Sequence, residues 1–341
     1  PDKEGDGVYL SVNIKMPTAD NTRSYTDGDN SSNDGTEIGK DYENNVNTVY
    51  LVLATNTDQA ATNNVFIAWG EIPAADIVKN TTGTQYTSKA TLSKSQLATY
   101  YGSDLNKPLE NNEVNVYVFC NPTLSLRSRL EAEELATVKG NSWIDAVGEY
   151  NTSDTNPEVI WNENNFLMSN ISTAVRAIPK TLAAWDAFTE ETNPFNLSGL
   201  NKDVEDCDNS ANNETTPRGA INVERTAARF DFRDGSPEFD GKNGESNLYQ
   251  VIHNDAENEE DWIYYINIKL NKMSLTNMNK QFYYLRRVSD NGLPTGPGFK
   301  VCGAELPWFT STANGLVQNK DGNYVISPTA QMMTGPILND F

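Results

Sequence analysis

Histidine and cysteine are scarce in this sequence of 341 residues, which holds one histidine, His253, and three cysteines. A single histidine with no recognisable nucleophile motif around it makes no catalytic constellation, so we interpret it as a structural or surface residue. Cys120, Cys207 and Cys302 lie far apart, allow at most one disulfide, and lack the C-x-x-C spacing of a metal site. We therefore expect no enzyme activity and no cofactor or metal.

Long hydrophobic runs and basic residues are also in short supply. No apolar stretch reaches the roughly 18 residues that a membrane-spanning helix needs. Lys and Arg number 26 against 47 Asp and Glu, which gives a net charge of −21. Nucleic acid and anionic lipid surfaces would be repelled, so neither is an expected partner. The polar composition with 15 tyrosines is more typical of an extracellular β protein than of a helical cytosolic enzyme.

Acidic residues are abundant, but they form no recognisable site. Residues 27–35 resemble a calcium loop, yet Ser32 and Ile38 stand where that loop needs glycine and glutamate. A solvated loop is the favoured interpretation, and the same holds for the acidic cluster at residues 203–208. A glycosidase pair cannot be selected from adjacent carboxylates that occur throughout such a chain, such as Glu133 with Glu134 and Glu259 with Glu260.

The clearest pattern in the chain is its first apolar segment. Residues 8–16 alternate between apolar and polar side chains, which is the period of a half-buried β-strand. After Pro17 a long polar segment, residues 18–47, carries Arg23 near its start. From the pattern alone we expect an N-terminal strand followed by a protease-accessible loop. The apolar positions are Val8, Leu10, Val12, Ile14 and Met16.

The patterns in the rest of the chain also predict one strand after another. Residues 113–120 place Val114, Val116 and Val118 on one face and Tyr117 and Phe119 on the other, so we expect burial on both faces. Short helices are expected at residues 95–101, ending at Gly102, and at residues 125–138. Further strands are expected at residues 48–54, 64–70, 84–92, 220–232, 248–252, 262–270 and 281–288.

A segment rich in Asn, Asp and Thr, residues 193–219, is the most convincing linker. It predicts an N-terminal domain of residues 1–219 and a C-terminal domain of residues 220–341. The fold class expected from these patterns is all-β, with two β-sandwiches in tandem and short helices inserted in the first.

Several segments in this order resemble the fimbrillins of the Bacteroidales, the FimA/Mfa1-type major fimbrial subunits, and Mfa1-like members in particular. Residues 221–232 resemble their V-E-R-x-x-A-R segment, and residues 166–170 resemble the F-x-M-S/T piece upstream of it. Residues 273–287 resemble the stretch after the next strand. The first fifty residues fit as well, with an apolar strand, a polar loop holding an arginine, and a second strand.

The resemblance implies a fold and a mechanism. Such subunits have two transthyretin-like Greek-key β-sandwich domains, are made as lipoproteins, and are carried to the outer membrane. A protease cuts after an arginine in the loop that follows the first strand, and a strand of the next subunit replaces the strand that is freed. By this resemblance Arg23 is the cleavage site and Ser24 the new N-terminus, with Lys15 and Lys40 as alternatives. Val8, Leu10, Val12, Ile14 and Met16 would be the side chains that leave their pockets.

The resemblance further implies partners and a location. The expected partners are neighbouring subunits of the same kind and a host or bacterial surface receptor, with membrane contact only through a lipid on the precursor. The absent signal peptide and lipid-bearing cysteine lead us to expect a trimmed N-terminus. The strands near Phe341 are too few to close a second sandwich, so we expect the C-terminal donor segment to be either missing or disordered.

A second hypothesis is a surface adhesin that does not polymerise, or a module that binds a glycan or host protein, as a tip or anchor subunit would. It requires exposed aromatic side chains that form a platform. The candidates are Trp69, Trp143, Trp161 and Trp185.

Overall fold

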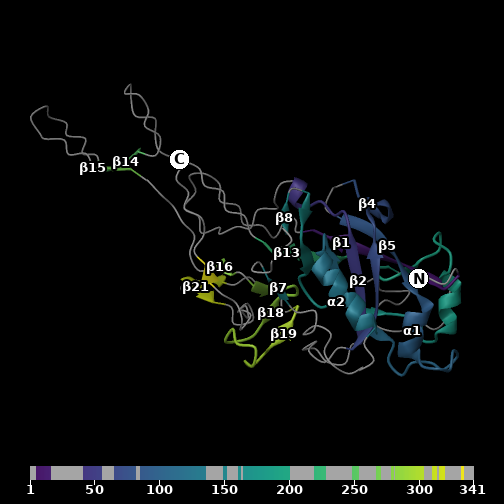
Figure 1. The fold of residues 1–341 in the computed structure, drawn as a ribbon. Helices are drawn as coiled ribbons and strands as arrows, with labels where there is room; N and C mark the ends of the chain where they lie inside the picture. Colours follow the sequence, from purple (N-terminus) through teal and green to yellow (C-terminus); the bar gives the residue numbers. More distant parts are fainter. Residues whose placement is uncertain are drawn as a thin grey trace, which may run out of the picture. The chain divides into compact units, whose positions relative to one another are not determined.

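The computed structural model describes residues 5–16, 41–55, 65–81, 85–135, 149–151, 160–162, 164–199, 219–227, 248–252, 266–269, 278–279, 281–302, 309–312, 315–318 and 332–333. The chain divides into two compact units. The first comprises Pro1–Ala227 and Phe282–Pro328, and the second comprises Ala228–Gln281 and Thr329–Phe341. Strands dominate the described residues and helices are few, which confirms the all-β class (Figure 1). Two transthyretin-like sandwiches in tandem stay a prediction.

The first unit is built on a ten-stranded sheet. Eight strands follow the order β3-β2-β6-β10-β13-β1-β5-β4, while β11 pairs with β6 and β12 pairs with β1 beside this path. The strands are β1 (Gly7–Lys15), β2 (Val49–Thr55), β3 (Phe66–Ile72), β4 (Ile77–Lys79), β5 (Gln85–Ser93), β6 (Glu113–Cys120), β10 (Met168–Asn170), β11 (Val175–Ala177), β12 (Phe195–Asn196) and β13 (Ile221–Arg225).

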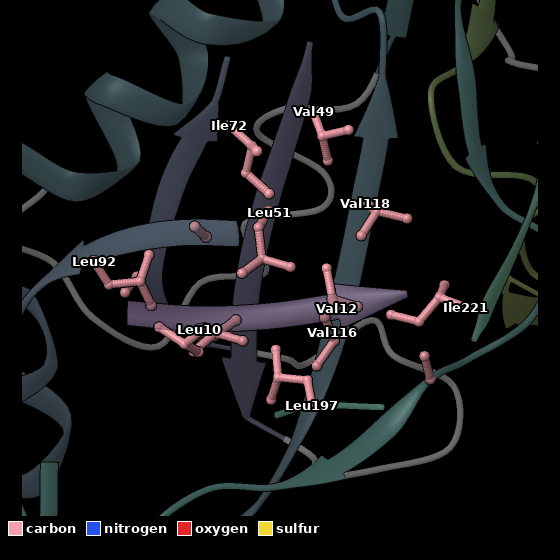
Figure 2. Packing of buried hydrophobic residues seen from close by; sticks show 14 of the residues in the cluster. Leu10, Val12, Val49, Leu51, Ile72, Leu92, Val116, Val118, Leu197 and Ile221 are labelled. Carbon is pink, nitrogen blue, oxygen red and sulfur yellow. The ribbon is translucent and has the colours of Figure 1, made fainter. Parts of the chain in front are cut away.

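The sheet folds over so that β1 and β5 face β2 and β6 across an apolar core. Figure 2 shows β1 running across β2 and β6, with Leu10 and Val12 close to Leu51 and Val116. Leu92 of β5 and Ile221 of β13 belong to the same cluster. Two layers of sheet with interdigitated apolar side chains are the arrangement of a β-sandwich.

Strand β6 is buried on both faces, as its sequence predicted. Val116 and Val118 belong to the core that faces β1, whereas Tyr117 and Phe119 belong to a second cluster on the opposite face. That second face is covered by helix α2 (Leu124–Leu135), through Leu126 and Leu130, and by a later segment of the first unit. The later segment contributes Tyr284, Leu285, Val301 and Cys302.

The helices begin and end close to the positions the sequence indicated. Helix α1 (Lys94–Tyr101) ends where Gly102, at φ 89°, donates its N–H to Ala98 O. Glycine adopts such a positive φ without the steric cost of a Cβ atom, which makes it a common helix terminator. Three 3₁₀ helices complete the helical content described: η2 (Asp41–Glu43), η3 (Ala74–Asp76) and η4 (Ala183–Phe188).

The side chain of Asn170 continues the hydrogen bonding to β6 between the end of β10 and the start of β11. Its side chain accepts a hydrogen bond from the Val118 N–H (2.7 Å) and donates one to Val116 O (3.0 Å). A buried amide thereby replaces one rung of backbone pairing along β6, because an asparagine side chain carries the same donor and acceptor as a peptide group.

Short two-stranded ribbons make up the remaining described structure. In the first unit they pair β8 with β9, β7 with β17, β18 with β19, and β20 with β21; in the second unit they pair β14 with β15 and β16 with β22. Their bounds are β7 (Glu149–Asn151), β8 (Trp161–Asn162), β9 (Asn165–Phe166), β17 (Gln281–Tyr283), β18 (Arg287–Val288), β19 (Lys300–Val301), β20 (Phe309–Thr312), β21 (Gly315–Gln318), β14 (Leu248–Ile252), β15 (Ile266–Lys269), β16 (Met278–Asn279) and β22 (Met332–Met333).

The strand expected to open the second half, β13, pairs instead with two strands of the first unit. It runs antiparallel to β10 (Asn170 opposite Val223) and parallel to β1 (Ile14 opposite Ile221). A domain boundary at residues 219 and 220 stays a prediction, while β13 itself lies in the principal sheet.

Candidate functional site

The alternating apolar side chains of β1, and that of Met16 directly after it, are buried. Val8, Leu10, Val12, Ile14 and Met16 are each between 0% and 2% exposed, whereas the residues between them are partly exposed. All five belong to the core cluster that β2, β5 and β6 also line. The predicted strand and the predicted burial of its apolar face are therefore both present in the structure.

Strand β1 is bonded on both of its edges. On one edge all nine residues pair antiparallel with β5, from Gly7 opposite Ser93 to Lys15 opposite Gln85. On the other edge Leu10 lies opposite Phe195 of β12 and Ile14 opposite Ile221 of β13, both in parallel. In the described sheet β1 therefore forms the seam that joins β5 and β4 to the other strands.

Between β12 and β13 a side chain completes the second edge. The Asn13 N–H donates to Ser198 Oγ at 2.8 Å, and the Leu197 N–H donates to Ser11 O at 2.8 Å. On the β5 side, Ser88 Oγ donates to Val12 O at 3.1 Å. The backbone of β1 thus lies in a slot. Its two walls are β5 on one side and β12 with β13 on the other, both of which offer hydrogen-bonding groups, and its floor is the apolar core.

Charged side chains hold β13, one wall of this slot, from both of its faces. Glu224 accepts from Arg286 Nη1 at 3.1 Å, and Arg225 Nη1 donates to Asn44 Oδ1 at 2.9 Å with Glu43 Oε2 at 3.8 Å. Burial raises the pKa of Glu224 above its usual range, although the Arg286 charge opposes this shift. The V-E-R segment singled out in the sequence thus fastens β13 to two other segments of the first unit.

The proposed cleavage site lies outside the described residues, as do its alternative Lys40 and the acidic loop at residues 27–35. Lys15, the other alternative, is the last residue of β1 and pairs with Gln85 on one side and Asn222 on the other. A protease needs an extended, unpaired backbone, so cleavage after Lys15 would require this end of the sheet to open first.

Two of the four tryptophans that the second hypothesis needs for an exposed aromatic platform are buried. Trp69 is buried and donates its Nε1–H to Glu134 Oε2 at 2.8 Å; Trp185 is fully buried and donates to the Tyr101 hydroxyl at 2.9 Å. Trp161, on β8, is 50% exposed. Trp143 lies outside the described residues.

Cys120 and Cys302 are free thiols, and both are buried. Burial raises the pKa of Cys120 far above the usual range, and it raises that of Cys302 to about 12.

Cys207, His253 and the acidic cluster at residues 203–208 lie outside the described ranges. Within those ranges no three His, Cys, Asp or Glu side chains gather so that they could hold a metal ion, and no helix is long and apolar enough to cross a membrane.

Sequence reasoning missed two polar groups, one after the end of β6 and one before the start of β1. Asn121, at φ 51°, accepts from the Asn47 N–H and donates to the carbonyl oxygens of Asn45 and Phe166. The Asn121-Pro122 pair signalled only the end of a strand. Asp6, just before β1, was likewise overlooked, since its partners Ser93 and Ser95 are distant in sequence.

Comparisons with known proteins give weak likenesses. No family model matches the chain, and no curated protein matches it. Among solved structures, a candidate cell adhesion protein of Parabacteroides distasonis ATCC 8503 is 15% identical with a TM-score of 0.35, over 82% of this chain and 58% of that one. A second candidate adhesion protein of that strain is 14% identical with a TM-score of 0.27, over 64% and 40%.

The tip fimbrial protein Mfa3 of Porphyromonas gingivalis, truncated at its C-terminus, is 14% identical with a TM-score of 0.30, over 97% of this chain and 80% of that one. The chain thus spans 58% and 40% of the lengths of the two adhesion proteins. Because these TM-scores are low, the function proposed below rests on the geometry of this chain.

Proposed function

We propose that the chain is a structural subunit of a cell-surface fimbria, which polymerises when a protease frees β1 and a strand of a neighbouring subunit takes its place. The observation that carries this proposal is the slot around β1, with five fully buried side chains and bonded edges on both sides. Addition of an extended strand to an open sheet edge is a general mode of protein association, in which backbone bonds give affinity and side-chain pockets give specificity.

The energetics favour replacement of β1 over simple loss. Each fully buried apolar side chain contributes roughly 1.5–3 kcal/mol, so the five contribute on the order of 8–15 kcal/mol together. The whole stability of a native domain is about 5–15 kcal/mol. A subunit that lost β1 without replacement would therefore be close to unfolding, whereas a second strand with the same alternation would restore the core.

The proposal assigns a role to each of the predicted residues. Cleavage follows Arg23, Ser24 becomes the new N-terminus, and the four apolar residues of β1 leave with Met16 in the released segment. The partners are neighbouring subunits and a host or bacterial surface receptor. The precursor is held at the outer membrane by an N-terminal lipid, and the mature subunit is part of the fimbria and mediates adhesion.

The test is to treat the chain with an arginine-specific protease, to determine the new N-terminus by mass spectrometry, and to image the sample for filaments. We expect cleavage between Arg23 and Ser24, release of the first strand, and filaments. If a donor segment lies outside this chain, it is supplied as an added strand peptide, and stable incorporation of that peptide replaces filaments as the readout. Resistance of the Arg23 bond in a folded subunit would refute the assignment of the cleavage site.

Clean cleavage followed by a stable monomer that accepts no strand would instead favour the second hypothesis, a tip or anchor subunit or binding module. The burial of Trp69 and Trp185 does not support an aromatic platform for that alternative.

A further inference from the structure

A carboxylate at the start of β1 is bound by the segment that joins β5 to α1. Asp6 Oδ2 accepts from Ser93 Oγ at 2.5 Å, from Ser95 Oγ at 2.8 Å and from the Ser95 N–H at 3.1 Å. The Asp6 backbone oxygen also accepts from the Lys94 N–H at 2.8 Å. The start of β1 is therefore held by four hydrogen bonds that no apolar side chain provides.

These bonds replace a cap that α1 does not make for itself. Ser93 occupies the N-cap position of α1, yet its side chain makes no capping hydrogen bond. The first N–H groups of a helix have no partner within the helix, and a negative charge is favourable beside them. Asp6 supplies both the acceptor and the charge from a strand distant in sequence.

The position of Asp6 relative to the apolar slots is fixed by the strand. Asp6 lies two residues before Val8, the first of the five buried side chains, and the antiparallel ladder to β5 begins between them at Gly7. When β1 leaves its slot, the cap of α1 and two serine hydroxyls lose their acceptor together with the core.

We propose that the strand that refills the slot carries an acidic residue two positions before its first buried apolar side chain, and that this carboxylate sets the register and direction of the strand. This inference rests on the proposed function, because it concerns the strand that replaces β1. The ligand class is an extended peptide with one carboxylate followed by alternating apolar residues. A strand that ran in the opposite direction would place its carboxylate at the far end of the slot, where Lys15 lies opposite Gln85.

The experiment uses the full chain, cut by the arginine-specific protease, unfolded in urea and refolded with an excess of fluorescent synthetic peptide. The reference peptide has the sequence of residues 5–16, and the test peptide has Asp6→Asn. A third peptide carries Gly in place of Asp6 and an added aspartate after Met16. A peptide with Ser11→Ala is the matched control, because the side chain of Ser11 is partly exposed and only its backbone bonds the walls of the slot.

We expect the Asp6→Asn peptide and the peptide with the displaced aspartate to bind about tenfold more weakly than the reference, since hydrogen bonds to a charged group are about twice as strong as neutral ones. The Ser11→Ala peptide should bind like the reference. On a subunit with Ser95→Ala, the difference between the reference and Asp6→Asn peptides should shrink, which shows that the two residues interact.

Equal binding of the reference and Asp6→Asn peptides would overturn the carboxylate anchor and leave strand replacement intact. Failure of every peptide to bind the cut subunit would overturn both. A double-mutant cycle of Asp6→Asn and Ser95→Ala on urea unfolding of the intact chain tests the anchor without cleavage, and additive effects there would also overturn it.

Discussion

A disulfide between β1 and β5 would trap the first strand and so test whether its departure is needed for assembly. Asn13 lies directly opposite Thr87, and Thr87 Oγ1 donates to Asn13 Oδ1 at 2.9 Å. The Asn13 N–H and the Ser11 carbonyl oxygen bond to Ser198 and Leu197, on the edge of β1 away from β5. Asn13 and Thr87 are therefore a non-hydrogen-bonded pair, whose side chains approach most closely in an antiparallel ladder.

Asn13→Cys with Thr87→Cys places two thiols at this position with both side chains outside the apolar core. The bridge would close a loop of residues 13–87, and loop entropy predicts a stabilisation of about 4.5 kcal/mol for a loop of that length. The lost Asn13–Thr87 hydrogen bond costs about 1 kcal/mol in return. The oxidised variant should therefore unfold at a distinctly higher urea concentration than the reduced one.

The native thiols do not interfere with this design. Cys120 and Cys302 are buried and have raised pKa values, so they stay protonated and unreactive at neutral pH. Cys207 is replaced by serine in the parent chain to leave the introduced pair as the reactive thiols.

The assay compares oxidised and reduced samples of the same double variant after arginine-specific cleavage. We expect the oxidised sample to retain the N-terminal peptide by mass spectrometry and to form no filaments, or to incorporate no added strand peptide where the donor segment is supplied. The reduced sample should release the N-terminal peptide and behave like the parent. Each single cysteine variant serves as a control for the substitutions themselves. Filaments formed at the parental rate by the oxidised, cut variant would refute the idea that β1 must leave.

Two further predictions concern the walls of the site. Gly70→Ala should destabilise the fold by roughly 1–3 kcal/mol. An added Cβ would lie 2.7 Å from Thr91 O and 2.9 Å from Leu92 Cδ2, where β3 meets β5. Urea unfolding measures the change, and an unchanged midpoint would show that β3 and β5 can move apart there without cost. Glu224→Gln should gain stability relative to the parent as pH rises above about 4.5. Burial raises the pKa of Glu224 in the folded parent. The contribution of Glu224 to the free energy of unfolding is therefore greatest when the side chain is protonated, and it is lost as pH rises through the folded-state pKa. Urea unfolding of both proteins from about pH 4 to about pH 7, a range that includes the ordinary pKa of a glutamate, measures this difference. A trend of opposite sign would contradict the assignment.

Much of the sandwich follows from local patterns in the sequence. Strand β1 alternates cleanly, and β6 is apolar on both faces, so each could be assigned from the period of its side chains. Gly102 marks the end of α1 because the positive φ there favours glycine. Such signals lie within the segment that they describe, which is why they can be read without the fold.

The pairing partners of these strands could not be predicted in the same way. Parallel pairing of β13 with β1 joins Ile221 to Ile14 across the length of the unit, and no local pattern records it. The roles of Asp6 and Asn170 depend on acceptors and donors that the folded chain brings together. Burial of Trp69 and Trp185 was also open, since a tryptophan in a strand or a short helix can face either the core or solvent.

The strand that we propose to leave is also among the most deeply buried. Cleavage of the loop after it explains how such a strand can be replaced. Release of β1 at a cost on the order of 8–15 kcal/mol is disfavoured by about six to eleven powers of ten while the strand remains tethered. Cleavage removes no contact of β1. It removes the tether, so a released strand dilutes into solution instead of returning from an effective concentration in the millimolar range. A neighbouring strand can then fill the apolar slots as β1 vacates them, and the core need never be empty. In the proposed exchange, the energetic barrier that keeps β1 in the uncut subunit becomes the barrier that keeps the joint between subunits closed.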